Sequence, residues 1–553
     1  PQGTPGQSRL DRQHQLLSYE SLTPMAETFD ADVIVVGSGA LGANAAYELS
    51  KAGKSVIMLE AGERIPRWKI LENSRNSSRH FNYNAPYPDM PGAHTTYNQD
   101  YLENTGSFAL RPGMLKLVGG TTWHWAAACW RYLPSDMKLK STYGQGRDWP
   151  IGYDDLEPWY QLAEEALGVV GVDEQDQSGQ NGPAFPPRSK PYPLPPEGKT
   201  YMFQRAEARL SPLGFHFVHE PNARVTRPYD GRPACAGNNN CMPACPIGAM
   251  YSGIFHADHA VAAGTKLITD ATAYKLEKGE GGKIVAVHYK SSKGDDVRLT
   301  ARYFVVAAHG LETPKLLLIS DVANSSDQVG RNLMDHTGMG MTFLADEPVW
   351  PGRGAVQQGG IFNRRDGAHR RDYAAIKHAL ANNVANPFVA GKLLKEGVMG
   401  PELDQRIRDE ASRRIEFSTV FEMLPHAGNR VQPHSTRRDA LGIPTLTVHY
   451  DVDDYVKAAR PVAQADFETF AKTMGGTQVD ISPGWQNRDH LMGTVIMGND
   501  PKDSVVDGDC RTHDHPNLFL ATTGVIPASG VINPTLTGVA LSIRLAHTIA
   551  KEV

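Results

Sequence analysis

The amino-acid sequence predicts an α/β protein whose central sheet is assembled from distant parts of the chain. Residues 32–36 form a nearly continuous apolar run that leads into a glycine-rich turn and a helical pattern, as expected of a buried parallel strand and the helix after it. A second buried run, residues 303–308, is also followed by a glycine and a helical pattern. Further along the chain, residues 418–423 and 445–450 resemble sheet strands. Strands that alternate with helices are typical of the α/β class.

Length and composition exclude several classes of protein. At roughly 150 residues per domain, a chain of 553 residues allows about two to four domains. The net charge of −5 is spread over mixed signs, which does not indicate nucleic acid or an anionic membrane surface as a partner. No apolar run reaches about 18 residues, so no transmembrane helix is expected. Five cysteines in so long a chain do not make a disulfide framework.

The first strand and helix carry a dinucleotide-binding fingerprint. Gly37, Gly39 and Gly42 form a G-x-G-x-x-G turn, a second strand follows at residues 56–59, and Glu60 closes it 18 residues after Gly42. This context predicts a Rossmann-like unit in which the glycines approach a pyrophosphate and Glu60 accepts hydrogen bonds from ribose hydroxyls. A carboxylate at this position favours FAD or NAD over NADP. The alternative is a purely structural glycine turn.

A second glycine pair marks another candidate contact with a flat cofactor. Gly119, Gly120 and Thr121 precede an indole-rich stretch that contains His124. Adjacent glycines indicate a close approach of the backbone to another group, and the indoles and imidazole are suited to packing against a planar ring. The alternative is a tryptophan-rich corner of the core in which His124 is simply a buried polar group.

Three cysteines fall within eleven residues of a loop rich in Gly, Asn and Pro. Cys235, Cys241 and Cys245 have a spacing unlike that of structural zinc sites, which use four ligands. Crowded thiolates on a bending loop that ends in Cys-Pro suit an iron–sulfur cluster, and three ligands indicate a three-iron cluster. The alternative is one disulfide with a free thiol left over.

The middle of the chain predicts further strands and helices. Residues 266–268, 274–276 and 284–289 resemble short strands, and a helix is expected to start at Glu312 after the buried run of residues 303–308. Residues 456–474 have a helical pattern that ends at a glycine pair. Residues 330–336 are either a solvated polar turn or a contact with the cofactor.

Several stretches together resemble one known family. They are Glu60-Ala61-Gly62, Gly119-Gly120-Thr121-Thr122-Trp123-His124-Trp125 and Asp148-Trp149-Pro150-Ile151-Gly152. These stretches resemble the glucose–methanol–choline (GMC) oxidoreductases. The cysteine loop, with Arg227-Pro228-Tyr229 before it, is similar to that of the flavin-bearing large subunits of bacterial membrane-bound sugar and sugar-acid dehydrogenases. That group oxidises gluconate, 2-ketogluconate, fructose, sorbitol or glucose.

The resemblance implies a domain plan and two cofactors. It implies a discontinuous Rossmann-like FAD-binding domain of residues 29–150, 255–340 and 485–553. Residues 151–254 and 341–484 would form a substrate domain with an antiparallel sheet, including the cysteine loop at 235–248. It also implies a [3Fe-4S] cluster on Cys235, Cys241 and Cys245, although Ala236 stands where relatives often carry another cysteine. Whether the flavin is attached covalently near His124 stays open.

The resemblance further implies the catalytic residues. His490 matches the family's active-site histidine, which takes the hydroxyl proton while hydride passes to flavin N5, a role suited to a neutral imidazole. Asn533 matches its partner and would position the substrate oxygen. Asn533-Pro534 is also a good start for a last helix with Leu536 and Val539 on its apolar face. Relatives tend to carry Asn at Asp489, and an ionised Asp489 facing the pocket would disfavour a sugar acid.

The resemblance also implies partners and a location. A flavin paired with a cluster favours a dehydrogenase that drains electrons to a multi-haem cytochrome c subunit at the periplasmic face of the inner membrane. A small companion subunit would carry the export signal, and membrane association would be through a partner. Residues 1–28 are expected to be a disordered leader or an expression remnant. The first choice of substrate is gluconate. The alternatives are a neutral-sugar dehydrogenase, an oxygen-using GMC oxidase without iron, and a non-catalytic flavoprotein.

Overall fold

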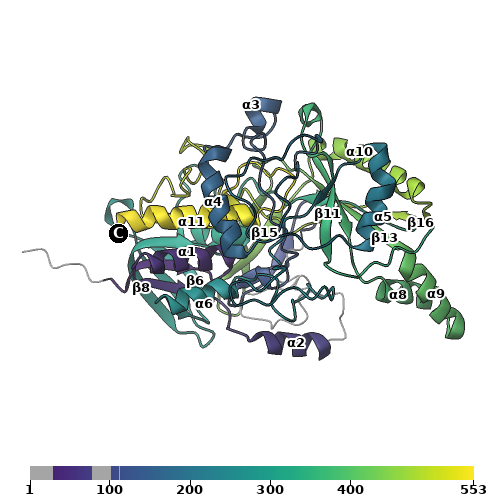
Figure 1. Cartoon of the computed structure of the whole chain (residues 1–553). Helices are drawn as coiled ribbons and strands as arrows, with labels where there is room; N and C mark the ends of the chain where they lie inside the picture. The colour runs from purple at the N-terminus through teal and green to yellow at the C-terminus, as the bar shows by residue number, and fades with distance from the viewer. Residues whose placement is uncertain (1–28, 77–100, 111–112) are drawn as a thin grey trace, which may run out of the picture.

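The computed structural model describes residues 29–76, 101–110 and 113–553, and the leader expected at residues 1–28 lies outside them. Figure 1 shows two lobes. The C-terminal helix α11 (Thr535–Glu552) lies in one lobe, and α9 (Gly400–Arg413) lies at the far end of the other. Within the described residues, no helix is both long enough and apolar enough to cross a membrane.

The first lobe is built on a mainly parallel sheet. In the described residues its strands are β1 (Ala31–Val36), β2 (Val56–Leu59), β5 (Lys266–Ile268), β6 (Thr272–Lys278), β7 (Ile284–Lys290), β8 (Asp296–Val306) and β18 (Leu518–Leu520). The order is β5-β2-β1-β8-β7-β6, with β18 beside β8. β8 pairs with β7 in antiparallel fashion through its first half and with β18 in parallel through its second half. The strands expected at residues 32–36, 56–59 and 266–268 are confirmed.

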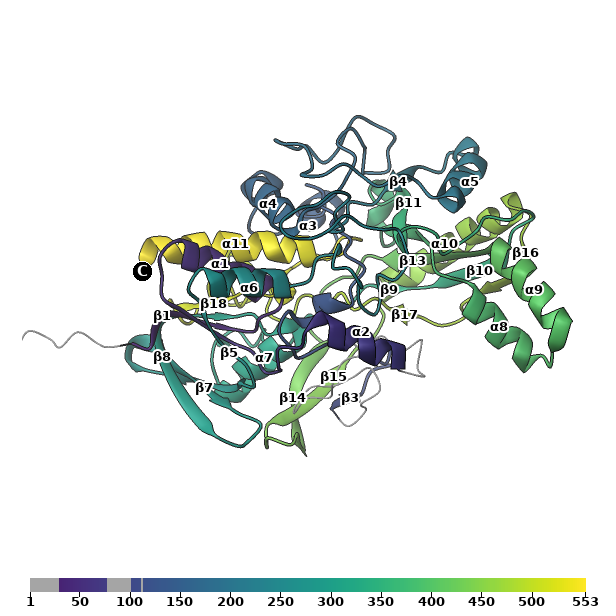
Figure 2. The same cartoon turned by 60° about the horizontal axis from the view of Figure 1, so that its bottom comes forward.

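Helices cover both faces of this sheet because its central strands are apolar on both sides. Val33, Ile34 and Val35 of β1 are fully buried, as in other parallel sheets. α1 (Ala40–Lys51) packs against α6 (Ile254–Ala262) and α11 on one face, and α7 (His309–Ser320) packs on β6 (Figure 2). α7 begins at His309, three residues before the predicted start at Glu312, because the chain turns directly from β8 into the helix.

The second lobe contains an antiparallel sheet. Its order in the described residues is β16-β10-β13-β12-β11-β4. The strands are β4 (Phe217–His219), β10 (Gly340–Leu344), β11 (Gln357–Arg364), β12 (Ile376–Ala381), β13 (Arg414–Phe421) and β16 (Thr477–Ile481). Around it lie α5 (Tyr201–Leu210), α8 (Asn386–Lys395), α9 and α10 (Asp454–Thr473). The helix expected at residues 456–474 is α10.

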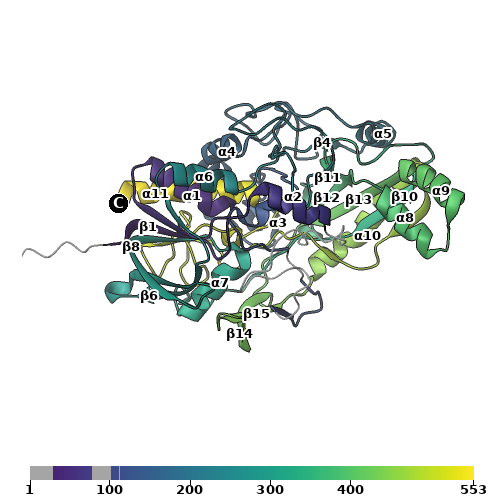
Figure 3. The same cartoon turned by 90° about the horizontal axis from the view of Figure 1, so that it is seen from below.

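The strand expected at residues 445–450 belongs to neither large sheet. β15 (Pro444–His449) pairs with β14 (Arg430–Arg438) and with β3 (Leu102–Asn104) in a small separate sheet. β9 (Thr337–Gly338) pairs with β17 (Gln486–Asn487). Figure 3 shows α2 (Arg67–Asn76) lying across the junction of the lobes. The remaining short helices are α3 (Leu139–Tyr143), η1 (Gly120–Trp123), η2 (Ser211–Leu213), η3 (Glu280–Gly282), η4 (Ala368–Arg371) and η5 (Thr523–Val525).

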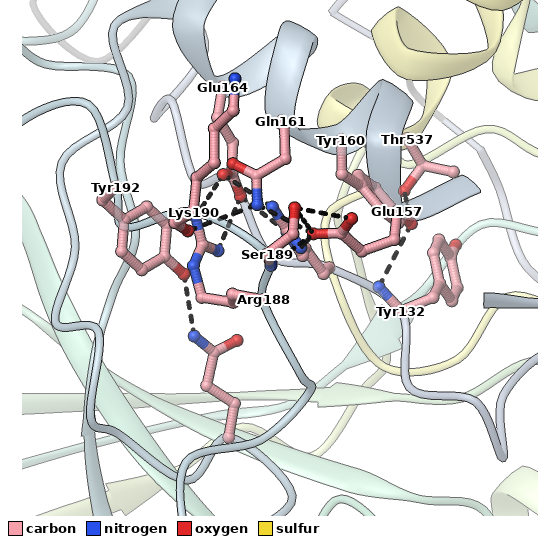
Figure 4. Close-up of polar contacts among 12 residues, drawn as sticks. Tyr132, Glu157, Tyr160, Gln161, Glu164, Arg188, Ser189, Lys190, Tyr192 and Thr537 are labelled. Atoms are coloured by element: carbon pink, nitrogen blue, oxygen red, sulfur yellow. Dashed lines mark hydrogen bonds and ion pairs between the residues drawn. The ribbon is translucent and has the colours of Figure 1, made fainter. Parts of the chain in front are cut away.

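A buried polar network fixes α11 against α4 (Tyr153–Leu167). The Tyr160 and Thr537 hydroxyls lie 2.8 Å apart, and the Tyr132 backbone N–H donates to Tyr160 (Figure 4). Glu164, also on α4, accepts hydrogen bonds from Arg131 at 2.8 and 2.9 Å and forms an ion pair with Arg188. The contact between Tyr160 and Thr537 holds the first turn of α11 in place, two residues after Asn533.

Candidate active site

A cavity of about 740 Å³ lies between the two lobes. One side is the carboxyl edge of the parallel sheet, where ligands of α/β proteins bind. The other side is the face of β12 and β13 that carries paired Lys377 and Val420, and paired Ala379 and Ser418. The predicted site residues that line the cavity are Gly37, Gly39, Glu60, Gly120, Thr121, His124, His490 and Asn533.

The three glycines of the fingerprint have different surroundings. A Cβ added at Gly37, where φ is +104°, would lie 2.5 Å from the Ala307 carbonyl oxygen, and one at Gly42 would lie 2.0 Å from that of Gly37. A Cβ at Gly39 would have no protein atom nearer than 4.0 Å, the Cα of Gly120. Gly37 and Gly42 are therefore required by packing, whereas Gly39 leaves an open backbone cradle on the cavity, as a pyrophosphate needs.

Glu60 lies at the end of β2 and closes the glycine-rich turn. Its Oε2 accepts from the Ser38 backbone N–H at 3.0 Å and from the Ser38 hydroxyl at 2.6 Å, and Oε1 accepts from the Gly62 N–H at 3.0 Å. Burial raises the pKa of Glu60, and these hydrogen bonds oppose the rise. The carboxylate thus organises the turn as well as facing the cavity, and its ribose contact stays a prediction.

The second glycine pair packs on the first glycine turn. A Cβ at Gly120 would lie 2.9 Å from the Gly39 Cα, and the Gly119 N–H donates to the Ser38 carbonyl at 3.2 Å. Thr121 accepts from the Leu115 N–H at 3.2 Å. Gly120, Thr121 and His124 line the cavity, whereas Gly119 is packed against Ile254 behind it. The close backbone approach that the glycine pair predicts is therefore an approach to the glycine-rich turn at Gly39.

His490 belongs to a chain of hydrogen bonds that runs in one direction beside the cavity. The Gly530 carbonyl accepts from His336 Nε2 at 3.0 Å, which leaves Nδ1 of the neutral His336 ring as an acceptor. His490 Nδ1 lies 2.9 Å from that atom and therefore carries its own proton. At the other end the Lys377 ammonium, which can only donate, bonds Asn533 Oδ1 at 3.0 Å. The Asn533 amide then donates to His490 Nε2 at 2.8 Å, so Nε2 carries the lone pair.

The electrostatic surroundings keep both imidazoles neutral. Burial lowers the pKa of His490 well below its usual range, and the neighbouring His336 and Lys377 lower it further. Burial also lowers the pKa of His336 to about 3. Beneath them the Asp335 carboxyl accepts from the His490 backbone N–H at 2.7 Å. Its pKa is raised to about 7 by burial and by the charge of Asp489. A neutral histidine with its lone pair on Nε2 is suited to accept a proton.

Asp489 faces the cavity, which its position in the sequence left undecided. Its Oδ1 accepts from the Gly113 N–H at 3.3 Å and from the Asn487 amide at 2.9 Å. A Cβ at Gly113 would lie 3.6 Å from Asp489 Oδ2 and 3.4 Å from His124 Cε1, so these two side chains approach one point. Burial raises the pKa of Asp489 to about 6. It is therefore mostly ionised at neutral pH.

The cysteine loop holds three thiols that are not in disulfides. Cys241 and Cys245 are buried and Cys235 is half-buried. Arg224 Nη1 lies 3.9 Å from Cys241 Sγ, and the Gly237 N–H donates to Cys235 Sγ at 3.4 Å. Within the described residues, no group of three or more His, Cys, Asp or Glu side chains is arranged to hold a metal ion. The donors suit an iron–sulfur cluster, but the thiols are not gathered about one point.

The loop is anchored to both lobes. The Gly354 N–H donates to the Gly237 carbonyl at 3.0 Å, and the Asn239 amide donates to the Asn382 carbonyl at 2.7 Å. Arg67 of α2 donates to the Cys245 carbonyl at 2.8 Å. Met242 lines the large cavity. The loop therefore lies against the cavity while its other side faces α2.

Sequence reasoning missed three functional side chains and gave Asn533 a helix-capping role that the structure does not show. α11 starts at Thr535 after an N-cap at Pro534, and the Asn533 side chain bonds His490 and Lys377 instead. His336, in the segment thought to be a polar turn or a cofactor contact, is fully buried against His490. Lys377 and Glu220 also line the cavity. In the sequence, the apolar residues next to Lys377 and Glu220 indicate buried strands, but nothing there marks these two side chains as part of a site.

A glycine-rich cradle and a neutral histidine on one cavity define an oxidoreductase that works with a bound dinucleotide. Residues 32–182 match the family model of FAD dependent oxidoreductases. Residues 232–338 and 425–542 match models of the GMC oxidoreductases. The chain belongs to the GMC oxidoreductase family, and it is an FAD-dependent enzyme acting on a CH–OH group.

Known proteins match over nearly the whole chain. It is 44% identical to the fructose dehydrogenase large subunit of Gluconobacter japonicus, with 95% of this chain and 99% of that protein covered. It is 23% identical to the gluconate 2-dehydrogenase flavoprotein of Pantoea cypripedii, covering 96% and 95%. A formate oxidase variant from Aspergillus oryzae has the same fold, with a TM-score of 0.64, 14% identity, and coverage of 95% and 99%.

Proposed function

We propose that the chain is the catalytic subunit of a dehydrogenase that oxidises a hydroxyl of a neutral sugar. The observation that carries the proposal is the one-directional hydrogen-bond chain, which leaves the lone pair of His490 on Nε2 beside the cavity. Alcohol oxidation requires a base at that place, because the hydroxyl proton leaves as the carbon loses its hydride.

The chain's own residues divide the work at the reacting hydroxyl. His490 Nε2 receives the hydroxyl proton, and His490 Nδ1 stays bonded to His336, so the ring keeps its orientation. When substrate binds, the Asn533 amide, held at Oδ1 by Lys377, would turn its N–H from His490 Nε2 to the substrate oxygen, which frees the Nε2 lone pair for the hydroxyl proton. Gly39 and Glu60 would hold FAD at the other end of the cavity. FAD, when bound, supplies the hydride acceptor.

The charges of the cavity favour a neutral sugar over a sugar acid. Its lining carries four basic side chains, Lys116, Lys315, Lys377 and Arg488, and four acidic ones, Glu60, Glu220, Glu312 and Asp489, so it has no excess of positive charge for a carboxylate. Arg488 is already bonded to the backbone carbonyls of Met339 and Thr419. A carboxylate substrate would therefore meet Asp489 without a free arginine to pair with. The 44% identity with a fructose dehydrogenase subunit supports the same choice. Gluconate, the first choice from the sequence, is the comparison substrate.

We further propose a [3Fe-4S] cluster on Cys235, Cys241 and Cys245 as the exit for electrons. The support is three unpaired thiols, N–H donors from Arg224 and Gly237 directed at sulfur, and a loop that touches the cavity through Met242. Hydrogen bonds to sulfur are a usual means of tuning cluster potential.

The relative's designation as a large subunit supports the proposal that companion subunits exist. We propose a multi-haem cytochrome c subunit as electron acceptor and a small export subunit, which place the complex at the periplasmic face of the inner membrane. The domain limits proposed are residues 29–150, 255–340 and 485–553 for FAD, and 151–254 and 341–484 for the substrate.

The test is dye reduction by the purified protein with D-fructose, D-glucose, D-sorbitol, gluconate and 2-ketogluconate, with and without oxygen. We expect turnover that is highest with a neutral sugar and indifferent to oxygen, and about three irons per flavin. His490→Ala should keep its flavin and lose roughly 10²- to 10⁴-fold in kcat. Peroxide formation without iron would identify an oxidase, and a preference for gluconate would reject the neutral-sugar choice.

A further inference from the structure

Lys377 is a buried cation on the face of β12 that covers the cavity. Its residue is only 4% exposed, and the neighbours on the same face are Ala379, Ser418 and Val420. These are small or medium side chains, so the lysine is the group that projects furthest from this part of the sheet. A lysine is seldom buried in a sheet unless it is paired, and its position needs a reason.

The ammonium has more hydrogen-bonding capacity than the protein uses. Lys377 has three N–H groups. Among the described residues one of them has a hydrogen-bond acceptor, Asn533 Oδ1 at 3.0 Å, and the ammonium lies 5.7 Å from the centre of the Trp130 ring. Leaving N–H groups of a buried charge without an acceptor costs free energy. Since Lys377 lines the cavity, the remaining N–H groups can be satisfied by a ligand there.

Glu220 compensates the charge of Lys377 without occupying its donors. Glu220 is 4% exposed, lines the same cavity, and accepts from the Asn222 amide at 3.0 Å. Burial lowers the pKa of Lys377 to about 8, and Glu220 opposes this fall. Burial raises the pKa of Glu220, and Lys377 opposes that rise. The pair is therefore a neutral unit that carries free donors, which suits a hydroxyl or carbonyl oxygen better than a carboxylate.

We propose that Lys377 is a specificity-determining residue that binds a second substrate oxygen, on a carbon near the one being oxidised. His490 and Asn533 hold the reacting hydroxyl, and Lys377 is one hydrogen bond further along the same chain. Its ammonium also fixes the Asn533 amide with the NH₂ group towards the base. The substrate class is thus a polyol or sugar, and simple alcohols leave the ammonium unsatisfied. This inference rests on the proposed function.

The experiment compares Lys377→Met and Lys377→Arg with wild type on the best sugar of the panel and on its monodeoxy analogues. Lys392→Met, an exposed lysine of α8, is the matched control. Because Lys377→Met leaves Glu220 unpaired, the double variant Lys377→Met/Glu220→Gln restores charge balance. Flavin absorbance and circular dichroism are recorded for each variant, so that loss of fold is distinguished from loss of binding.

We expect Lys377→Met to lower kcat/KM for the parent sugar by roughly 10- to 100-fold, chiefly through KM, with partial recovery in Lys377→Arg. One monodeoxy analogue should be a similarly poor substrate for wild type and should lose little more on Lys377→Met, because the contact is already absent. The double variant should behave as Lys377→Met does, and Lys392→Met as wild type.

Two results would overturn the inference. The first is an equal loss for the parent sugar and every analogue, which would limit Lys377 to holding Asn533 or balancing charge. The second is unchanged kinetics in folded Lys377→Met while wild type oxidises a sugar. Failure of the proposed function gives a different result, because wild type itself would then reduce the dye with none of the neutral sugars.

Discussion

Single residues in this active site act through the direction of their hydrogen bonds. The chain of hydrogen bonds through His490 ends at two groups that can each play only one part. The Gly530 carbonyl can only accept a hydrogen bond, and the Lys377 ammonium can only donate one. Every tautomer and amide orientation between them follows from those two ends. The basicity of His490 Nε2 is therefore a property of the whole chain of contacts, and it depends on His336, which does not line the cavity.

Replacement of His336 should lower activity without loss of flavin. In His336→Phe the His490 Nδ1–H loses its acceptor, so the ring can adopt the other tautomer or rotate, and we expect kcat to fall by roughly 10- to 100-fold. His336→Gln offers an acceptor and a donor at similar positions and should recover part of the rate. Steady-state dye reduction with the best sugar measures both. Equal rates for Phe and Gln variants would show that tautomer control is not the role of His336.

Asp489 should make stability depend on pH. Its pKa is raised from 3.8 to about 6, and that of Asp335 to about 7. A carboxyl with a raised folded pKa stabilises the fold at low pH, and this contribution is lost as pH rises through the folded pKa. Asp489→Asn keeps a hydrogen-bond acceptor and removes one negative charge. It also removes the repulsion that adds to burial in raising the pKa of Asp335. It should match wild type near pH 3, below the unfolded pKa, and be more stable by roughly 1–3 kcal/mol at pH 8.

Urea unfolding at saturating FAD, at both pH values, measures this difference. Asp454→Asn is the control, since the Asp454 side chain is 98% exposed. Parallel pH profiles for wild type and Asp489→Asn would contradict the expectation.

Among the elements, the turn between β1 and α1 has the strictest demands on its sequence. Three glycines occur within six residues, yet only two of them meet protein atoms where a Cβ would stand. Gly120 packs against Gly39 of this turn, and Glu60 accepts a hydrogen bond from Ser38 of the same turn. A local motif is thus supported by contacts from Glu60 and Gly120, which lie 18 and 78 positions after Gly42.

Alanine substitutions should separate folding from cofactor binding within this turn. Gly42→Ala places a methyl group 2.0 Å from the Gly37 carbonyl oxygen, and we expect insoluble or unfolded protein. Gly39→Ala meets no protein atom nearer than 4.0 Å and should fold, but its methyl group projects into the cofactor cradle, so FAD affinity should fall by at least about tenfold. Circular dichroism and flavin titration distinguish the two. A flavin-replete Gly39→Ala would contradict the assignment of the cradle.

At the scale of the whole molecule, one cavity joins lobes built from interleaved parts of the chain. The parallel sheet takes strands from residues 31–59, 266–306 and 518–520, and the antiparallel sheet from residues 217–219 and 340–481. The lining of the cavity comes from both lobes, so a ligand bound there contacts both. The stability of the two lobes should therefore be coupled through the cofactor.

Removal of FAD should destabilise both lobes together. A ligand that binds only the folded state adds RT ln(1 + [L]/Kd), about 4 kcal/mol at a thousandfold excess over Kd. We expect apoprotein to unfold at lower temperature and to recover on addition of FAD but not of NAD. Differential scanning calorimetry measures the melting temperature with and without FAD, and limited proteolysis shows whether both lobes lose protection together. An unchanged melting temperature, with a noncovalent flavin shown by its release in acid, would contradict the coupling.

Much of the fold follows from local patterns, as the glycine fingerprint, the buried runs of β1 and β8, and α10 illustrate. Such elements are encoded by neighbours in sequence, through periodicity, turn chemistry and burial of apolar runs. The sequence by itself also determined the family and its FAD cofactor, and it predicted the pair of His490 and Asn533, whose side chains lie 2.8 Å apart, because each sits in a recognisable motif.

The tertiary structure alone decided the chemistry around that pair. His336 lies 154 residues from His490, and Lys377 lies 156 residues from Asn533. No periodicity or spacing connects residues so far apart, since their contact is created by strands and loops from different lobes meeting at one cavity. For the same reason Asp489, whose orientation could not be inferred locally, proved to face the cavity. Position in the motif predicted His490 as the base, and long-range packing determined its tautomer, its neutrality and the charged side chains around the cavity.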